Sequence, residues 1–465
     1  MLTSSKLLPA SDFFVRWLPL AALCAVIAHH FWFVNSHAIN VPHEDDIYDF
    51  MQIISVVENA DSAGDAFKVL SKQYNDHRTS ASRLVVFGVY LAEGELNFHT
   101  LTLVANLGLL LILSLFYLTV RQERYCWVYL LVSALLLFNF RYFKIILFSQ
   151  AAFAYYYVCL YAFACIFTLH KVSGPKFLLA AVFCTLSSLT LASGHIVWLL
   201  GLVSLLHQCL VSGRRSLMWP AMWLLFAAVI LTLWYADFTQ GIYRITSELI
   251  ANNRDNAPVT ASEFLSRALV DPTIKQVLTQ YAAFFLVILG SAPIYFSTLG
   301  AGTAGFAILA VLLFVTLKFY KHDDIRLALY CWFLVAFAAA ATVGRALLTT
   351  PEYVLTHRYS FISALLVCTL ALLLQVRFAL VRTPAVLLIL LLAVTYWSWS
   401  NFHFDGPFQN HMSGRHSIFN SGYFPVVLTP LGESDGIVNK AISAGIYNPP
   451  CRPFPECERP SSLGD

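Results

Sequence analysis

The residues with the clearest chemical potential form an acidic cluster near the start of the chain. The segment His43-Glu44-Asp45-Asp46-Ile47-Tyr48-Asp49 places four carboxylates within six residues. Carboxylates this close repel one another unless a neighbouring group uses them. Two uses are open: a carboxylate can act as a general base toward an acceptor hydroxyl, and clustered carboxylates can bind a divalent cation. A third interpretation is structural, with Asp45 or Asp46 as the N-cap of a helix that begins near Ile47.

A second polar group follows soon after the first. The segment Tyr74-Asn75-Asp76-His77-Arg78 precedes Arg83 and an apolar run, Leu84 to Leu91, that is too short to cross a membrane. We expect this run to form a short helix at the membrane interface, with His77, Arg78 and Arg83 at the depth of the lipid headgroups. There the cationic groups either pair with a lipid phosphate or act as ordinary anchors at the interface.

Two arginines define a third group, later in the chain. Gly344-Arg345-Ala346 precedes Pro351-Glu352-Tyr353 and His357-Arg358-Tyr359. Because a planar guanidinium can donate to two phosphate oxygens at once, this Gly- and Pro-containing loop is typical of a phosphate clamp. The alternative is that both arginines only mark helix ends. His195, in the turn Ser193-Gly194-His195, is a weaker candidate for the same cavity, because a lone histidine in a tight turn is usually structural.

The composition indicates what must position these groups. Of the 465 residues, 58% are hydrophobic and only 12% are charged, whereas about 25% are charged in soluble proteins. Long apolar runs without charged residues recur along the chain, and a run of about 20 such residues crosses a bilayer. The chain is therefore predicted to be an all-α polytopic membrane protein. The net charge of +3 gives no reason to expect a nucleic-acid partner. The motifs of nucleotide hydrolysis, dinucleotide binding and serine hydrolases are absent from the sequence.

The distribution of charge predicts how the chain crosses the membrane. Lys6 and Arg16 precede the first apolar run, Trp17 to Val34, and basic loops lie on the cytoplasmic side. The loop that follows, residues 35–99, therefore begins outside the cytoplasm. The further spans that we expect are Leu101 to Val120, Cys126 to Phe140, Ala151 to Leu169, Phe177 to Ala192, Ile196 to Val211, Leu217 to Ala236, Leu327 to Val343, Phe361 to Val376 and Pro384 to Ser400.

The region between Tyr281 and Tyr320 supplies one more crossing. Its apolar stretch either crosses twice, or crosses once after a non-spanning hydrophobic helix that breaks near Gly290 to Pro293, and the charges favour one net crossing. We therefore expect about eleven transmembrane helices. They form one transmembrane domain, residues 1–400, with interfacial helices in the first outer loop and with outer loops at 35–99, 237–277 and 344–358. Residues 401–465 are expected to be a small extracytoplasmic tail.

The polar groups all fall on the outer face, where we expect the function. Within the spans, ionisable groups are limited to His29, His30 and His207, whereas ion-coupled transporters keep charged residues inside the membrane. In the tail, Cys451 and Cys457 either form a disulfide, which needs an oxidising compartment, or remain free thiols.

This arrangement resembles the C-type membrane glycosyltransferases, the GT-C superfamily, which use sugars carried on polyprenyl or dolichyl phosphate. The resemblance lies in a first span, a long outer loop that opens with His43-Glu44-Asp45-Asp46, interfacial helices and many further spans. In that superfamily an acidic residue at this position is the catalytic base, and the match falls on either Asp45 or Asp46. The Asn75-Asp76-His77-Arg78 segment and the loop from Gly344-Arg345 to Arg358-Tyr359 also look like segments of bacterial members. Among named groups, the chain looks most similar to the bacterial O-antigen-modifying glucosyltransferases.

The resemblance implies a GT-C-like bundle in the bacterial inner (cytoplasmic) membrane, with the active site facing the periplasm. It implies transfer of a hexose such as glucose from polyprenyl phosphate to a lipid-linked or lipopolysaccharide glycan such as O-antigen, by inverting displacement with an aspartate base. Donor phosphate binding is expected from Arg78, Arg345, His357 and Arg358. Weaker substrate contacts are expected from Glu44, Asn75, His77, His195 and Tyr359. No metal is required, although the carboxylates of Glu44, Asp49 and Glu352 leave room for a divalent cation.

Two other classes of function remain open. A flippase or transporter of a lipid-linked sugar also needs phosphate-binding arginines, but it should show polar groups along a path through the membrane. A noncatalytic component of a polysaccharide assembly complex would keep the helices without needing the acidic cluster. The sugar, the acceptor and the linkage depend on the shape of the pocket.

Overall fold

Helices make up almost all of the chain that the computed structural model describes. The described residues are 10–43, 45–74, 77–211, 217–236, 272–346, 349–355, 358–378, 383–404, 408–409, 412–413 and 433–449. They contain no strand, and Tyr74 and His77 form a single β-bridge. Eight of the described helices are long and apolar enough to cross a membrane. The prediction of an all-α polytopic membrane protein is confirmed.

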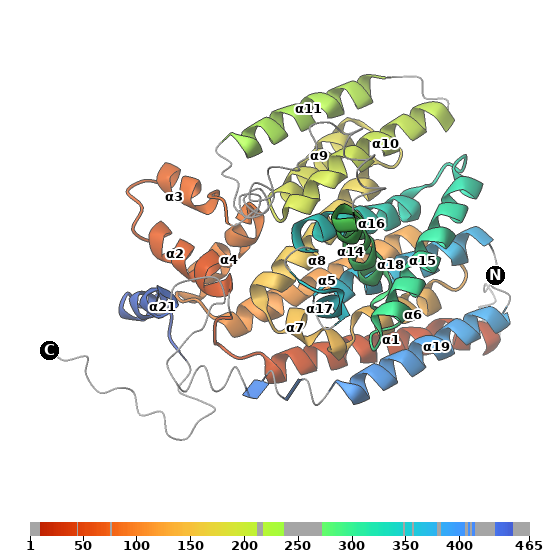
Figure 1. The fold of residues 1–465 in the computed structure, drawn as a ribbon, viewed down its shortest axis with the longest axis horizontal. Coiled ribbons are helices and arrows are strands. Elements are labelled where there is room, and N and C mark those ends of the chain that lie inside the picture. The colour runs from red at the N-terminus through yellow and green to blue at the C-terminus, as the bar shows by residue number, and fades with distance from the viewer. Residues whose placement is uncertain are drawn as a thin grey trace, which may run out of the picture.

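The long helices lie roughly parallel and form one bundle (Figure 1). Local sequence explains where some of them begin: the Asn97 side chain accepts hydrogen bonds from the first amides of one helix, and Ser297 does the same for another. The eight candidate spans lie in α1 (Ala10–His37), α5 (Phe98–Val120), α8 (Ser149–Leu169), η3 with α10 (Ala192–His195 and Ile196–Val211), α11 (Met218–Tyr235), α15 (Thr298–Phe319), α16 (Arg326–Arg345) and α18 (Tyr359–Phe378).

Three other expected spans form shorter apolar helices. α6 (Cys126–Leu137) is followed by the 3-10 turn η2 (Phe140–Tyr142) and α7 (Phe143–Ile146), and this pair is bent by 40°. α9 (Gly174–Ser188) and the apolar part of α19 (Thr383–His403) are shorter than the about 20 residues of a straight crossing. The expected number of eleven crossings therefore stays a prediction.

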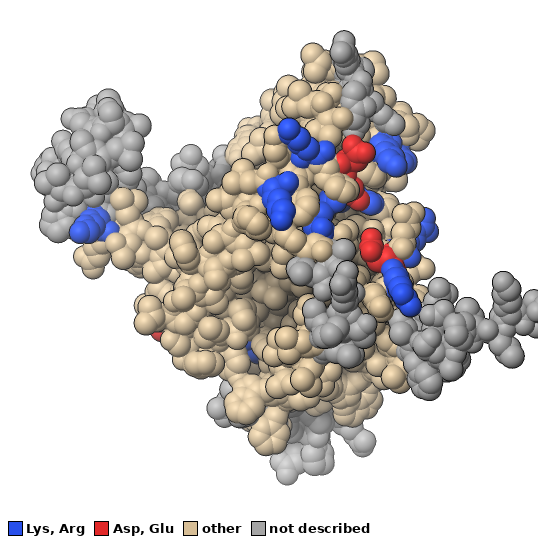
Figure 2. Space-filling model, turned by 90° about the vertical axis from the view of Figure 1, so that its right-hand side faces the viewer, with Lys and Arg blue, Asp and Glu red and all other residues tan. Residues whose placement is uncertain are grey.

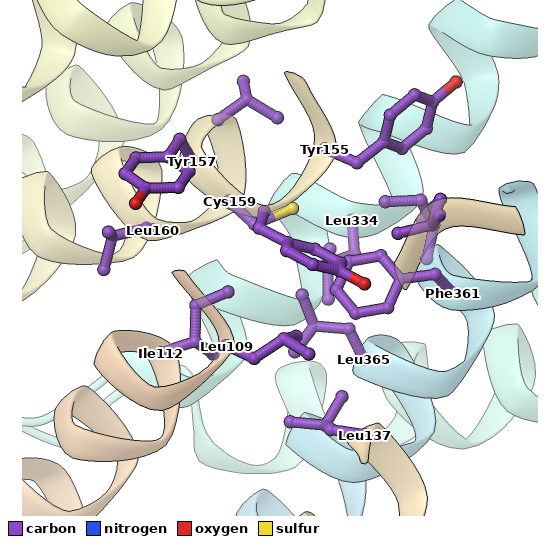
Figure 3. Close-up of a cluster of buried hydrophobic side chains, with 14 of the residues drawn as sticks. Leu109, Ile112, Leu137, Tyr155, Tyr157, Cys159, Leu160, Leu334, Phe361 and Leu365 are labelled. Atoms are coloured by element: carbon purple, nitrogen blue, oxygen red, sulfur yellow. The ribbon is translucent and has the colours of Figure 1, made fainter. Parts of the chain in front are cut away.

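α8 is the central helix of the bundle. It contacts α5, α9, α10 and α16, and nearly all of its side chains are buried. The aromatic rings of Tyr156 and Phe361 lie 4.8 Å apart, and aliphatic side chains from α5, α6, α16 and α18 surround them (Figure 3). The contacts with these four helices hold α8 in its position within the bundle.

Basic side chains gather at the end of the bundle where α1 begins (Figure 2). That end holds the loops after α5, α8 and α15 and the last turn of α18. Its described basic residues are Arg121, Arg124, Lys171, Lys176, Lys318, Lys321, Arg326 and Arg377, against the acidic Glu123, Asp323 and Asp324. The positive-inside rule predicts that this end faces the cytoplasm. Asp45 lies at the opposite end of the bundle, which we call the outer end.

α14 (Pro272–Gly290) does not run along the bundle. It is seen almost end-on in Figure 1, while the spans around it are seen from the side. Its apolar part, Lys275–Gly290, is shorter than a crossing, which fits the expected non-spanning helix. α14 packs very closely against α15, because an added Cβ at Gly305 would lie 2.0 Å from the backbone oxygen of Leu286.

The half-buried guanidinium of Arg141, in η2, joins segments that are far apart in the sequence. It donates to the backbone oxygens of Ser291 and Ala292, at the break after α14, and to that of Leu355. It also lies 3.9 Å from the centre of the Tyr295 ring. Leu355 ends the short helix α17 (Pro351–Leu355), so this contact helps to hold the end of α17.

The first outer loop forms a helical layer at the outer end of the bundle. It contains the π-helical turn η1 (Asp46–Met51), α2 (Gln52–Val57), α3 (Ala63–Leu70) and α4 (Ser80–Glu93), which covers the expected interfacial run. The described part of the tail, α21 (Glu433–Ser443) and the residues up to 449, packs against η1 and α2. Most of the second outer loop, together with Cys451 and Cys457, lies outside the described residues.

The α14–α15 contact predicts different effects for two neighbouring glycines. Gly305→Ala should destabilise the protein by about 1–3 kcal/mol, because its Cβ overlaps a backbone oxygen and the two helices must separate. Gly302→Ala is the matched control, because its Cβ would meet only a Val287 methyl group at 4.0 Å. Thermal unfolding of both variants in detergent measures the difference, and equal stability would contradict the close packing.

Candidate functional site

A cavity of about 150 Å³ lies at the outer end of the bundle, where segments distant in the sequence meet. The first outer loop, the start of α8, the η3 turn, the end of α16 and the start of α18 all contribute to it. The lining residues are Asp45, Tyr74, His77, Gln150, Ala154, Tyr155, Leu191, Ala192, Ser193, Phe337, Ala340, Ala341, Gly344, Arg345, Arg358 and Tyr359. The cavity thus unites residues from the three polar groups that the sequence singles out.

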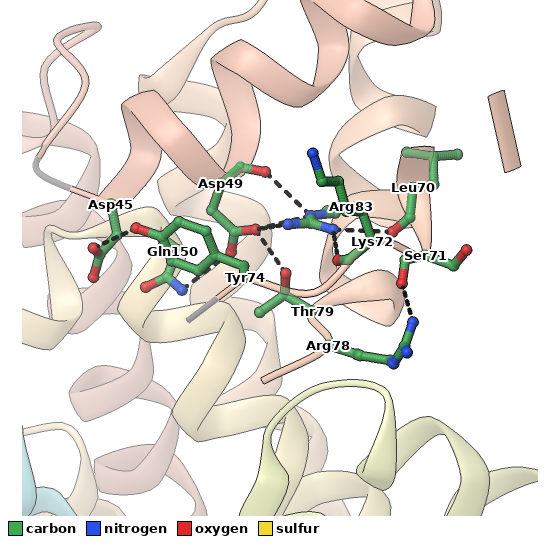
Figure 4. A network of polar contacts seen from close by, with 10 residues as sticks. All are labelled: Asp45, Asp49, Leu70, Ser71, Lys72, Tyr74, Arg78, Thr79, Arg83 and Gln150. Carbon is green, nitrogen blue, oxygen red and sulfur yellow. Dashed lines mark hydrogen bonds and ion pairs between the residues drawn. The ribbon is translucent and has the colours of Figure 1, made fainter. Parts of the chain in front are cut away.

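Asp45 presents its carboxylate to this cavity. It immediately precedes η1, and its Oδ1 accepts a hydrogen bond of 2.7 Å from the Tyr74 hydroxyl (Figure 4). Tyr74 is itself fixed, because its backbone exchanges two hydrogen bonds with His77. His77 also lines the cavity, and its Nδ1 accepts from the backbone amide of Ala192. Asp45 is therefore a half-buried acid with one fixed donor.

Asp46 makes a different set of contacts. Its Oδ1 accepts from the Ser149 hydroxyl at 2.6 Å and from the Gln150 amide at 3.0 Å, and its Oδ2 accepts from the His43 amide. The side chain is 2% exposed and does not line the cavity. A carboxylate at a helix N-terminus satisfies free amides and interacts favourably with the helix dipole. Asp46 therefore caps α8, whereas Asp45 makes no capping bond to η1.

Asp49 forms the centre of a buried polar network (Figure 4). Its Oδ1 accepts from the Arg83 guanidinium at 2.8 Å and from the Thr79 hydroxyl at 2.6 Å, and its Oδ2 accepts from Gln150. Burial raises the pKa of the Asp49 carboxyl, whereas the guanidinium and the other donors act to lower it. Arg83 neither pairs with a lipid phosphate nor serves as an interfacial anchor, as was expected of it, because it is 1% exposed and ion-paired with Asp49.

Arg345 and Arg358 give the cavity two cationic groups. Among the described residues, neither guanidinium has a hydrogen-bond or ion-pair partner, and that of Arg358 lies 5.9 Å from the centre of the Tyr155 ring. Burial acts to lower the pKa of Arg358, but Tyr155, Tyr359 and Asp45 raise it above its ordinary value. Arg358 is therefore cationic and can accept an anionic ligand.

Some residues expected at the site lie elsewhere. Arg78 donates to the backbone oxygens of Trp234 and Ser71 and does not line the cavity. His195 also does not line it, and its ring packs edge-on against Trp234 at 4.5 Å. Glu44, Asn75 and His357 lie outside the described residues.

Sequence reasoning did not select some residues of the cavity wall. Tyr74 lies within the polar segment at 74–78 and was the easiest to find. Gln150 begins an apolar span, and a polar residue in the first turn of a span is a weak signal. Tyr155 lies in a run of three tyrosines within that span and has no signal at all. No group of three or more His, Cys, Asp or Glu side chains in the described chain is arranged to hold a metal ion.

The Asp49–Arg83 pair predicts a large loss of stability. Arg83→Met should destabilise the protein by about 3–5 kcal/mol, because it leaves a carboxylate buried without its counter-ion. Lys68→Met is the matched control, since it removes the exposed ion pair with Asp65 and should leave stability unchanged. Unfolding in detergent compares the two, and similar midpoints would refute the structural importance of the buried pair.

Comparison with known proteins gives no relative for this chain. No protein-family model, curated protein or solved structure matches it. The functional interpretation therefore depends on the residues of the cavity.

Proposed function

We propose that the chain is a membrane glycosyltransferase that takes a sugar from a polyprenyl-phosphate carrier. One observation carries the proposal: a single cavity holds the Asp45 carboxylate together with two guanidiniums, Arg345 and Arg358, that have no hydrogen-bond or ion-pair partner among the described residues. Transfer from a sugar phosphate needs a base for the acceptor and cations for the leaving phosphate. The cavity offers both.

In the proposed reaction an acceptor hydroxyl attacks the anomeric carbon of the donor sugar. The new bond forms as the bond from that carbon to the phosphate oxygen breaks, and the phosphate leaves with the electron pair. Because the hydroxyl attacks opposite the leaving phosphate, this direct displacement inverts the configuration of the carbon. Asp45 removes the proton of the acceptor hydroxyl, while Tyr74 holds the carboxylate in position. Arg345 and Arg358 stabilise the negative charge that develops on the phosphate. Asp46 has no part in this step, because its oxygens cap α8.

The location and size of the cavity support a lipid-linked donor. A volume of about 150 Å³ suits one sugar ring. The cavity lies at the outer end of the bundle, where the phosphate of a carrier can reach the arginines while its hydrocarbon chain stays in the membrane. The proposal includes a periplasmic active site in a bacterial inner membrane and an acceptor such as O-antigen or another lipid-linked glycan. The proposed reaction requires no metal ion, so sugar transfer should continue after a chelator is added to the assay.

The proposal also includes the eleven crossings of a GT-C-like bundle. α6 with α7, α9 and α19 would add three crossings to the eight long spans. α6 with α7 follows α5 and precedes α8, α9 lies between α8 and α10, and α19 follows α18. Labelling of single cysteines placed in the loops from either side of the membrane tests this topology.

The roles of the two aspartates can be separated by substitution. Asp45→Asn should reduce sugar transfer by about 10²–10⁴-fold with normal stability, because the amide cannot accept the proton. Asp46→Asn should lower the thermal midpoint and retain measurable transfer, because it weakens the cap of α8. The measurement is product formation by mass spectrometry, with purified protein, a panel of polyprenyl-phosphate sugars and glycan acceptors. Full activity of Asp45→Asn would refute the assignment of the base.

The two arginines of the cavity predict how their substitution changes the KM for the lipid donor. Arg345→Ala and Arg358→Ala should each raise the KM for the lipid donor about tenfold or more, because each removes a charged hydrogen-bond donor for phosphate. Arg78→Gln should leave the donor KM unchanged, since Arg78 bonds to backbone oxygens outside the cavity. An unchanged donor KM in both alanine variants would contradict the phosphate clamp. Tight binding of lipid-linked sugars without transfer would favour a flippase.

A further inference from the structure

The tail of the chain returns to the loop that carries Asp45. α21 packs against η1 and α2, and both sides of this contact are apolar and buried. Phe50 and Met51 in η1 are fully covered, as are Val438 and Ala441 in α21. A segment about 400 residues away in sequence therefore covers the turn that follows the proposed base.

The sequence at the end of α21 directs the chain toward this loop. Gly445 has a φ of +70°, which favours glycine. The amide of Ile446 donates to the backbone oxygen of Ala441, and that of Gly445 donates to the oxygen of Ile442. These two bonds form a Schellman motif, which ends the helix and reverses the chain. The reversal places Ile446 and Tyr447 against the first outer loop.

Three hydrogen bonds then fasten the tail to the first outer loop. The Leu96 amide donates to the Ile446 oxygen at 2.7 Å, the Tyr447 hydroxyl donates to the Asn40 oxygen at 2.7 Å, and the Asn40 side chain donates to the Asn448 oxygen. The Tyr447 ring is 1% exposed and packs edge-on against Phe98. We call these six residues, Asn40, Leu96, Phe98, Ile446, Tyr447 and Asn448, the tail clasp.

The clasp joins both ends of the site-bearing loop. Asn40 precedes the acidic cluster, and its Oδ1 also accepts from the Phe98 amide at the start of α5. The chain between Asn40 and Leu96 holds Asp45, η1 and Tyr74. π-helical turns are rare and are frequently found at functional sites. The packing of α21 on η1 therefore bears directly on the position of Asp45.

We infer that the tail clasp is a positioning element, which holds η1 so that the Asp45 carboxylate faces the cavity. Tyr447 is its central positioning residue, because it fills a buried site and bonds to Asn40. The inference rests on the proposed function only for its kinetic effect. Loss of the clasp should loosen η1 and lower kcat, while the donor KM, which depends on Arg345 and Arg358, stays the same.

The test uses the full-length protein and the variant Tyr447→Phe, which keeps the ring and removes the bond to Asn40. Hydrogen exchange of the backbone amides at 45–51 should accelerate about tenfold, with the amides of α16 unchanged, and kcat should fall about tenfold at constant donor KM. Ser443→Ala is the control, because its hydroxyl bonds only within α21. A second variant, Ala441→Glu, removes the packing of α21 and should show the same local effect.

The outcomes separate this inference from the proposed function. Unchanged exchange at 45–51 in both variants, or exchange that rises equally throughout the chain, would overturn the clasp as a positioning element. Exchange does not depend on sugar transfer. A wild-type protein that transfers no sugar would therefore refute the proposed function, while faster exchange at 45–51 would still support the clasp.

Discussion

The capping of α8 by Asp46 is the contact on which the site depends. α8 is the most buried of the spans, and its first amides need acceptors at the outer end of the bundle. Asp46 supplies a carboxylate that bonds to both Ser149 and Gln150. The first outer loop is thereby attached to the most buried of the candidate spans. The neighbouring Asp45 is held at the cavity as a direct consequence.

Asp49, which forms the ion pair with Arg83, also attaches the first outer loop to α8. Gln150 donates its side chain to Asp49 and its backbone amide to Asp46, so one residue of α8 connects two carboxylates of the cluster. Repulsion among the three described aspartates of the cluster is relieved because each of them has its own donors. Asp45, with Tyr74 as its hydrogen-bond donor, is the one of these three that lines the cavity. Two of the aspartates thus have structural contacts within the protein, and the third lines the cavity.

The cationic side of the cavity is positioned by separate contacts. Arg345 ends α16 and Arg358 precedes α18, and both helices pack on one another within the bundle. Arg141 binds the end of α17 to the break after α14, which places the segment before Arg358. The Asp45 carboxylate and the two guanidiniums therefore come from distant parts of the sequence. Their distance depends on the packing of the whole bundle.

Composition and local sequence patterns predict the class of the fold and several residues of the cavity. Apolar runs of fixed length and few charges predict spanning helices, because the bilayer imposes the same requirement on every segment. Local patterns also found Asp45, His77, Arg345, Arg358 and Tyr359, which all line one cavity. These predictions depend on local composition, and local composition can be read without knowing the contacts.

The contacts of each of these residues follow from the packing of the helices. Asp45 and Asp46 are identical neighbours in sequence, and they differ because α8 presents free amides to one of them and Tyr74 approaches the other. Arg83 was expected at the interface, yet it is buried against Asp49. The contact of α21 with η1 and the bond from Tyr447 to Asn40 join residues about 400 positions apart. Such pairings depend on how the helices pack, and no local pattern encodes them.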